Sequence, residues 1–287
     1  METLCSGFGL LEGPVWDPAR GLLFADADRG GVYCLDRGGE VSTVEPHRRG
    51  IGGMVRHARG GLIVSGRNVG YKGPLAPTTM VLLDKDPANG VVGFNDITTD
   101  SRGRIFAGAL GFIPTETEHS GSGQEGRAAP LFLIELDGSC RQVYPTIQLS
   151  NGMGFSPDGT LFYHADSGDR TVYVYDVETD GGLSGRRAFA SVTEGLPDGL
   201  AVDAAGSIWL AVAHGGQVVV FAPDGSLERR LDFPVPMVTS LCFGGDDMRD
   251  LYVVSGSEGT GRRDAGAIFR LRCAVPGLAI AAAQVKI

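Results

Sequence analysis

Long apolar runs, paired cysteines and basic clusters are all scarce in this sequence of 287 residues. No window approaches the ~18 consecutive apolar residues of a membrane-spanning helix, so we expect no membrane span. The N-terminus, Met1 to Cys5, lacks the basic region and the apolar stretch of a secretory signal. The five cysteines are widely spaced and include no C-x-x-C pair, which fits neither a disulfide framework nor a zinc knuckle. These absences predict reduced thiols and a cytoplasmic protein.

Positive charge is also in the minority, because 25 Lys and Arg face 34 Asp and Glu, giving a formal net charge of −9. An acidic surface repels phosphate backbones, so we expect no nucleic-acid partner. The G-x-S-x-G nucleophile motif and the H-E-x-x-H zinc motif are both absent. A G-x-G-x-x-G match at Gly121 to Gly126 has no strand before it and no helix after it, so it predicts a flexible loop.

Glycine is abundant, with 45 residues, and it marks a repeat. A turn ending in glycine is followed by a short apolar strand, and an aspartate usually precedes that glycine. Asp and Gly are the residues that tight turns require. The phrase begins at Gly21, Gly61, Gly103, Gly159 and Gly206, and a sixth copy without the glycine begins at Asp250.

A second strand is expected after each copy, from Val32 to Leu35 in the first and from Met80 to Leu83 in the second. Six copies at spacings of roughly 40 to 56 residues match the four-stranded blades of a β-propeller. An open β-sandwich is the alternative, which six regular copies disfavour. The only fair helical candidate is Val275 to Val285, and Pro276 and Gly277 interrupt its start.

We therefore predict an all-β fold, a six-bladed β-propeller with a central metal-binding channel, as a single domain over residues 1–287. The interval between the third and fourth copies is the longest and contains an insertion at about 110–130, rich in Gly, Ser, Thr and Glu. An insertion in one blade extends a loop on one face, which is often the binding face. We expect this segment to form a lid or rim.

Oxygen-bearing side chains recur at one phase of the repeat, eight or nine residues before the turn glycine: Glu12, Asn95, Asn151 and Asp198. Equivalent strand starts surround the channel of a propeller, so these four side chains should converge. Two carboxylates and two carboxamides without sulfur or imidazole favour a hard divalent cation, Ca²⁺ first, with Mg²⁺, Mn²⁺ or Zn²⁺ as alternatives. The competing interpretation is four ordinary turn or strand-cap residues.

The phrases around these residues resemble the SMP-30/gluconolactonase/LRE-like family, which includes regucalcin and bacterial gluconolactonases. The resemblance extends from about residue 10 to 280 and rests on Leu11 to Trp16, Phe94 to Asp96, Ser150 to Ser156, Leu196 to Leu200 and the later Thr239 to Gly245. It implies a six-bladed propeller with one central divalent metal and, usually, lactone hydrolysis.

By this resemblance the metal ligands are Glu12, Asn95, Asn151 and Asp198, and Asp198 is also the general base or, as in some relatives, the nucleophile. Asn95 and Glu125 would contact the substrate, although Glu125 lies in the insertion and aligns loosely. The metal would polarise the substrate carbonyl, and Asp198 would orient or deprotonate a water molecule.

One position departs from the family. Sugar-lactonase members carry a substrate-binding arginine two residues before the asparagine of the Asn-Asp pair, where this chain has Gly93. A glycine cannot hold an oxygen-rich substrate by charge-assisted hydrogen bonds. We therefore expect a small-molecule substrate other than a simple sugar acid lactone, bulkier or more apolar.

Two other functional classes stay open at this stage. One is a non-catalytic calcium-binding propeller, and the other is a metal-assisted lyase or isomerase on the same scaffold. The sequence leaves the oligomeric state undetermined.

Overall fold

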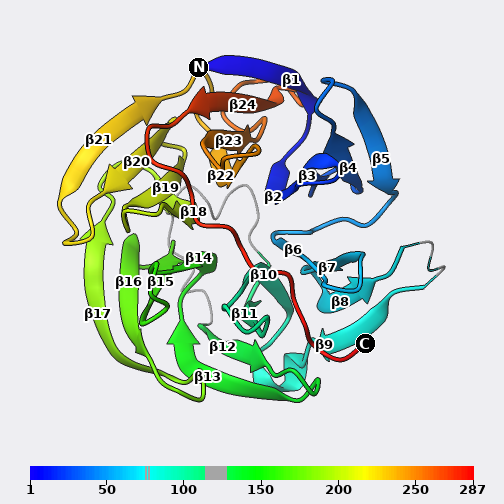
Figure 1. Ribbon diagram of the computed structural model, residues 1–287, viewed down its shortest axis with the longest axis vertical. Helices are drawn as coiled ribbons and strands as arrows, with labels where there is room; N and C mark the ends of the chain where they lie inside the picture. Colours follow the sequence, from blue (N-terminus) through cyan, green and yellow to red (C-terminus); the bar gives the residue numbers. More distant parts are fainter. Residues whose placement is uncertain (75, 77, 114–127) are drawn as a thin grey trace.

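The computed structural model describes residues 1–74, 76, 78–113 and 128–287. In this part of the chain the strands form six four-stranded antiparallel sheets, arranged as blades around a central axis (Figure 1). The prediction of an all-β, six-bladed propeller is confirmed. Helix is limited among these residues to a 3₁₀ turn at Pro87–Asn89. None of the described helical segments is long and apolar enough to cross a membrane.

The strands of each blade run outward from the axis in the same order. The innermost strands are β2 (Leu11–Asp17), β6 (Met54–Arg56), β10 (Gly93–Thr99), β14 (Ser150–Phe155), β18 (Leu196–Val202) and β22 (Val238–Gly244). The second strands are β3 (Gly21–Asp26), β7 (Leu62–Val64), β11 (Ile105–Leu110), β15 (Leu161–Asp166), β19 (Ile208–Ala213) and β23 (Asp250–Ser255).

The third and fourth strands lie further from the axis. The third strands are β4 (Val32–Leu35), β8 (Asn68–Lys72), β12 (Ala129–Ile134), β16 (Thr171–Val177), β20 (Gln217–Phe221) and β24 (Gly266–Arg272). The rim strands are β5 (Val41–Glu45), β9 (Met80–Asp84), β13 (Cys140–Ile147), β17 (Leu183–Ser191), β21 (Leu227–Asp232) and β1 (Glu2–Phe8). The segment Met80 to Leu83 is thus a rim strand and not the third strand of its blade.

Aspartate and glycine make the recurring turn between the first two strands. Asp17 Oδ1 accepts a hydrogen bond from Ala19 N at 2.9 Å, and Asp203 Oδ1 accepts one from Ala205 N at the same distance. Gly21 has a φ of 124°, and a Cβ at this position would lie 2.3 Å from the backbone oxygen of Leu35. Glycine is therefore required there both by backbone conformation and by space.

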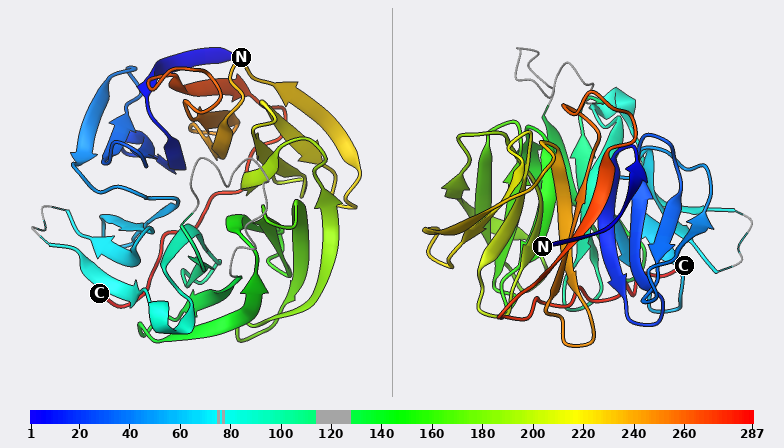
Figure 2. Two further views of the ribbon diagram at one scale, coloured as in Figure 1. Left: turned by 180° about the vertical axis from the view of Figure 1, so that it is seen from behind. Right: turned by 90° about the horizontal axis from the view of Figure 1, so that it is seen from above.

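The N-terminus closes the ring of blades. Strand β1 pairs antiparallel with β24, so the last blade combines three strands from the C-terminal part of the chain with one from the beginning. Figure 2 shows β1 at the rim beside the C-terminal strands. This pairing joins segments more than 250 residues apart and fixes the circular arrangement.

The C-terminal tail runs across the axis at one end of the ring (Figures 1 and 2). The helix considered for Val275 to Val285 is not formed, because this segment is extended and bonds to the blades instead of to itself. Hydrogen bonds join Leu278 N to Val202 O (2.9 Å), Thr99 Oγ1 to Ala281 O (2.5 Å) and Ala283 N to Arg56 O (2.8 Å). The tail thereby links the far ends of three innermost strands.

Apolar side chains pack mainly between neighbouring blades. Phe106 and Phe162 are fully buried with ring centroids 5.1 Å apart, and they join the third and fourth blades. Similar clusters occupy the other interfaces. All five cysteines are free thiols, as expected.

Candidate metal centre

The innermost strands contact one another all the way around the axis. Register irregularities interrupt five of them. Four lie where the sequence places candidate ligands, after Glu12 in β2, after Phe94 in β10, after Ser150 in β14 and after Pro197 in β18, and the fifth lies between Val238 and Ser240 in β22. A bulge inserts an unpaired residue and redirects its side chain. Each of the four candidate ligands thus lies in or directly beside an irregularity of its strand, in addition to occupying the same position of the blade repeat.

A chain of hydrogen bonds links three of these blades. Asn95 Nδ2 donates to Ser150 O at 2.9 Å and to Asn151 Oδ1 at 2.7 Å. Asn151 Nδ2 donates to Ser167 Oγ at 2.7 Å, and the Ser167 hydroxyl donates to Pro197 O at 2.5 Å, next to Asp198. Because a backbone carbonyl can only accept, the chain fixes which way each carboxamide points.

The last blade joins the first in a similar way. The Thr239 hydroxyl lies 2.5 Å from the backbone oxygen of Leu11, which directly precedes Glu12. Thr239 and Ser240 stand at the repeat position that the ligands occupy in other blades. In this blade the position carries no candidate ligand, and the Thr239 hydroxyl instead forms a hydrogen bond with the strand that contains Glu12.

Two glycines make close approach possible in the ring. In the second blade, Gly52 takes the repeat position of a ligand, and a Cβ there would lie 2.1 Å from Asn95 Oδ1. A Cβ on Gly152 would lie 2.2 Å from Leu200 N, in the strand that carries Asp198. The absence of these side chains therefore gives Asn95 and the Asp198 strand their room.

Three carboxyl groups influence one another at the axis. Burial raises the pKa of Glu12 well above its usual range, and the charges of Asp198, Asp96 and Asp28 raise it further. Asp198 is 7% exposed, and its pKa is raised by burial and then by Asp96. Burial also raises the pKa of Asp96 to about 7. Negative charge concentrated in this way calls for a cation or for protons.

Asp96 is the acidic residue of this centre to which the sequence analysis gave no role. It follows Asn95 within the irregular part of β10, where two successive residues lie opposite one on the neighbouring strand. The adjacent Asn-Asp pair was a usable signal, because a bulge allows neighbours to reach the same region. Asp96 also touches the second blade, since its Oδ1 lies 2.9 Å from where a Cβ of Gly53 would be.

The donor set consists of oxygen atoms only. Two carboxylates and two carboxamides match the preference of Ca²⁺ and Mg²⁺, and two negative charges match a divalent ion. No group of three or more His, Cys, Asp or Glu side chains in the described part of the chain is arranged to hold a metal. A cation here would therefore depend on the carboxamides of Asn95 and Asn151, both oriented by the hydrogen-bond chain.

Glu125 and most of the 110–130 insertion lie outside the described residues, so the structure does not bear on their predicted substrate contact. Gly93 is buried in β10, where its backbone faces Gly66 of the second blade. The buried ring of His164 supports the centre from behind, because its Nε2 lies 2.8 Å from Ser150 Oγ. Burial and Arg186 lower the pKa of His164 to about 3, so this imidazole is neutral.

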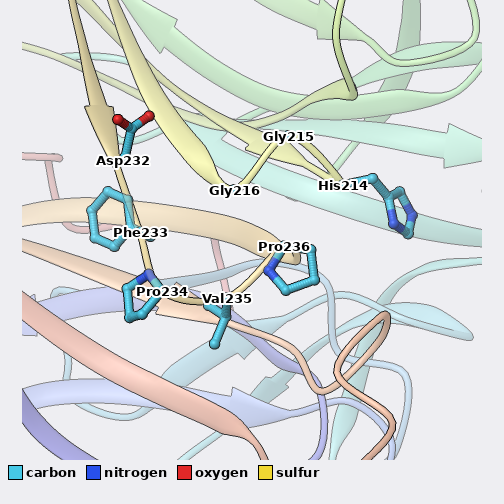
Figure 3. Close-up of a pocket in the computed structure, with 8 residues that line it drawn as sticks. All are labelled: His214, Gly215, Gly216, Asp232, Phe233, Pro234, Val235 and Pro236. Carbon is cyan, nitrogen blue, oxygen red and sulfur yellow. The ribbon is translucent and has the colours of Figure 1, made fainter.

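A separate pocket lies between the turn that follows β19 and the connection from β21 to β22 (Figure 3). Its wall is formed by His214, Gly215, Gly216 and the segment Asp232 to Pro236. It contains none of the predicted site residues. The candidate centre is thus defined by the axial ring and not by this pocket.

These features define a class, the six-bladed propellers, here with candidate site residues on the innermost strands of several blades. Residues 10–257 match the sequence profile of the SMP-30/Gluconolactonase/LRE-like region. The chain belongs to this family.

The relatives include lactonases. Pentonolactonase XacC from Haloferax volcanii is 35% identical over 96% of this chain and 94% of its own length. A 6-deoxy-6-sulfogluconolactonase from Pseudomonas putida is 32% identical, covering 93% of this chain and 92% of its own. The solved structure of the calcium-binding protein regucalcin from Agrobacterium tumefaciens superposes with a TM-score of 0.82 at 21% identity, over 98% and 96% of the two chains.

Proposed function

We propose that this protein is a divalent-metal-dependent lactonase, with Glu12, Asn95, Asn151 and Asp198 as metal ligands and Ca²⁺ as the favoured ion. The observation that carries the proposal is the hydrogen-bond chain from Asn95 to Pro197, which orients two carboxamides beside mutually repelling carboxyls. The lactonase relatives support the reaction, and the calcium-binding regucalcin structure supports the ion.

A bound cation would supply Lewis-acid stabilisation of the negative charge that develops on the lactone carbonyl oxygen. The chain's own residues provide the rest. Asp198 is nearly buried, so its carboxylate stands in a water-poor environment suited to accepting a proton from an attacking water molecule. Asn95 is held by two acceptors and offers a fixed polar contact to the substrate.

Hydrolysis adds one water molecule across the ester bond. The acyl carbon gains the water oxygen while Asp198 takes one proton of the water. The bond from the acyl carbon to the ring oxygen then breaks, and Asp198 returns that proton to the ring oxygen, which leaves as an alcohol. We place the substrate contact at the axial end that carries the ligands, because the C-terminal tail crosses the opposite end (Figure 2).

The direct test is a panel of four-, five- and six-membered lactones assayed with purified protein in EDTA, and after adding back Ca²⁺, Mg²⁺, Mn²⁺ or Zn²⁺. We expect chelation to abolish ring opening and one or more ions to restore it. Hydrolysis that is insensitive to chelator would exclude the metal. Metal binding without turnover of any lactone would instead favour the calcium-binding or the lyase and isomerase alternatives, which product analysis by NMR separates.

A further inference from the structure

An arginine of the second blade lies beside the candidate ligand Asn95. Gly66 and Phe94 form an isolated antiparallel bridge, with Phe94 N donating to Gly66 O at 2.7 Å and Gly66 N to Phe94 O at 3.1 Å. Arg67 follows Gly66 and Gly93 precedes Phe94, so in this antiparallel arrangement both residues lie on the same side of the bridge. Figure 1 shows β7 and β8, which flank Arg67, next to β10.

The other side of this bridge reaches the ligand ring. Ser65 and Asn95 lie on this side, and the Ser65 Oγ accepts hydrogen bonds from Gly52 N and Gly53 N at 3.2 and 2.8 Å. Asn95 Oδ1 approaches the same Gly52. The turn that carries Arg67 is therefore joined directly to the candidate metal centre.

A comparison of equivalent positions in two blades independently places Arg67 beside the ligand ring. Val64 pairs with Met54 in the second blade as His164 pairs with Met153 in the fourth. Three residues further on in each case come Arg67 and Ser167. The Ser167 hydroxyl contacts the ligand carboxamide of Asn151, so this repeat position borders the ring.

The positive charge here has no partner in the described part of the chain. Arg67 is exposed and makes no ion pair or hydrogen bond with those residues. Nearby, the acceptors of Arg48 among the described residues are all neutral: Ser65 O, Asn68 O and Asn68 Oδ1, at 2.9 to 3.0 Å. Burial and the charge of Arg67 lower the pKa of Arg48. Arg48 comes from the connection between β5 and β6, and Arg67 from the turn between β7 and β8. Neither guanidinium has a carboxylate partner among the described residues, and two neighbouring positive charges of this kind favour an anion.

We infer that Arg67, with Arg48 behind it, binds a negatively charged substituent of the substrate held at the axial centre, an inference that rests on the proposed lactonase function. Gly93 presents no side chain from the opposite strand, so it does not obstruct the guanidinium. The substrate class is a lactone that carries a carboxylate, sulfonate or phosphate, since a guanidinium binds these groups through two parallel hydrogen bonds. The expectation of a more apolar substrate rested on Gly93, and Arg67 removes that reason.

The kinetic test compares lactones that share one ring and differ in charge: glucono-1,5-lactone and its 6-phospho and 6-carboxylate forms. We expect Arg67→Gln to raise KM for the anionic forms roughly 10- to 100-fold, the loss typical of a hydrogen bond to a charged group. The neutral lactone should change by no more than about two- to threefold. Arg59→Gln is the matched control, because Arg59 is an exposed arginine in the turn between β6 and β7, at the other end of the same blade.

Moving the arginine across the bridge gives a second variant. Gly93 does not require positive φ, and a Cβ there would lie 3.1 Å from Gly66 O, so an arginine at this position requires the Gly66 backbone to move by a few tenths of an ångström. In the Arg67→Gly, Gly93→Arg double variant we expect the anionic preference to return to within about tenfold of the wild type. Equal KM changes for charged and neutral lactones in Arg67→Gln would overturn the inference and leave the lactonase proposal standing.

Binding separates the two proposals if no lactone is hydrolysed. Calorimetry on the Ca²⁺-loaded protein would compare gluconate with 6-phosphogluconate. Arg67-dependent binding of the phosphorylated acid without turnover would support the anion site and refute the hydrolase. If the wild type neither hydrolyses a lactone nor prefers the anionic acid, both proposals fail.

Discussion

Asn95 Nδ2 donates a 2.7 Å hydrogen bond to Oδ1 of Asn151, a residue of the neighbouring blade. The same Nδ2 donates to Ser150 O, so both carboxamides are oriented by the protein itself. A site that is ordered in advance loses less conformational entropy on binding its ligand. This contact connects the blade repeat to the chemistry proposed for the axis.

Ser167 tests whether that chain matters. Ser167→Ala removes the acceptor of Asn151 Nδ2 and the donor to Pro197 O. We expect Ca²⁺ affinity, measured by calorimetry, to fall about 10- to 100-fold, as happens when partners of metal ligands are removed. Ser226→Ala, at the exposed turn between β20 and β21, is the control. Unchanged affinity in Ser167→Ala would show that the carboxamides need no such support.

Asp198 is the proposed base. Asp198→Asn keeps the size and one oxygen, and it removes the proton acceptor. We expect kcat to fall by about 10³-fold or more, within the usual range for general-base catalysis. Calorimetry would show whether Ca²⁺ still binds, and Asp224→Asn at the same exposed turn is the control. Near-normal turnover in Asp198→Asn would assign the proton transfer to another group, with Asp96 the next candidate.

Stability of the metal-free protein should fall as pH rises. The pKa of Asp96 is about 7 in the fold against an ordinary 3.8, and the pKa values of Glu12 and Asp198 are raised too. The folded state therefore binds more protons than the unfolded state above about pH 4, and its stability declines by up to about 1.4 kcal/mol per pH unit for each group. We expect Tm in EDTA to drop between pH 5 and pH 8, and added Ca²⁺ to raise Tm more at pH 8. An EDTA Tm that rises over this range would contradict the clustering of the three carboxyls.

The tail provides a prediction about stability. Val285 is 1% exposed and packs in the apolar cluster between the second and third blades, whereas the neighbouring Lys286 is exposed. Val285→Asp should cost about 3 kcal/mol or more, because it loses apolar burial and places a carboxylate in an apolar setting. Thermal or urea unfolding would measure this loss, with Lys286→Gln as the control. Equal stability of the two variants would mean that the tail is not docked.

Secondary structure was predictable where the local sequence signal was strong. The prediction failed where contacts with neighbouring strands or blades determined the conformation. The repeated Asp-Gly turns identified each blade, since turn conformation depends on a few adjacent residues. Strand β8 (Asn68–Lys72) was missed because its Asn, Gly and Lys have low strand propensity. It forms nevertheless, because β7 and β9 supply hydrogen-bond partners on both sides. The C-terminal tail illustrates the opposite error, a predicted element that does not form. Its apolar pattern resembles that of a helix, but its backbone forms hydrogen bonds with the blades instead.

The candidate site shows the same division. A shared phase in the repeat selected Glu12, Asn95, Asn151 and Asp198, because equivalent residues of a circular repeat must face one axis. Ser167 does not occupy the repeat position of the ligands. It lies in the turn after β15, so the repeat alone does not reveal its hydrogen bond to Asn151. Nor does any local pattern bring the Arg67 turn beside Gly93, since the Gly66–Phe94 bridge that does so forms between two different blades.

The sequence by itself determined the number of blades, the family and which oxygen-bearing side chains share one position of the repeat, because these follow from turn chemistry and from periodicity along the chain. Only the tertiary structure decided which side chains touch: the Asn95 to Asn151 contact, the nearness of Asp96, the closure by β1 and the course of the tail. The physical reason is that these contacts join segments far apart in sequence. Their geometry is set by how closely the blades pack around the axis, which no local pattern encodes.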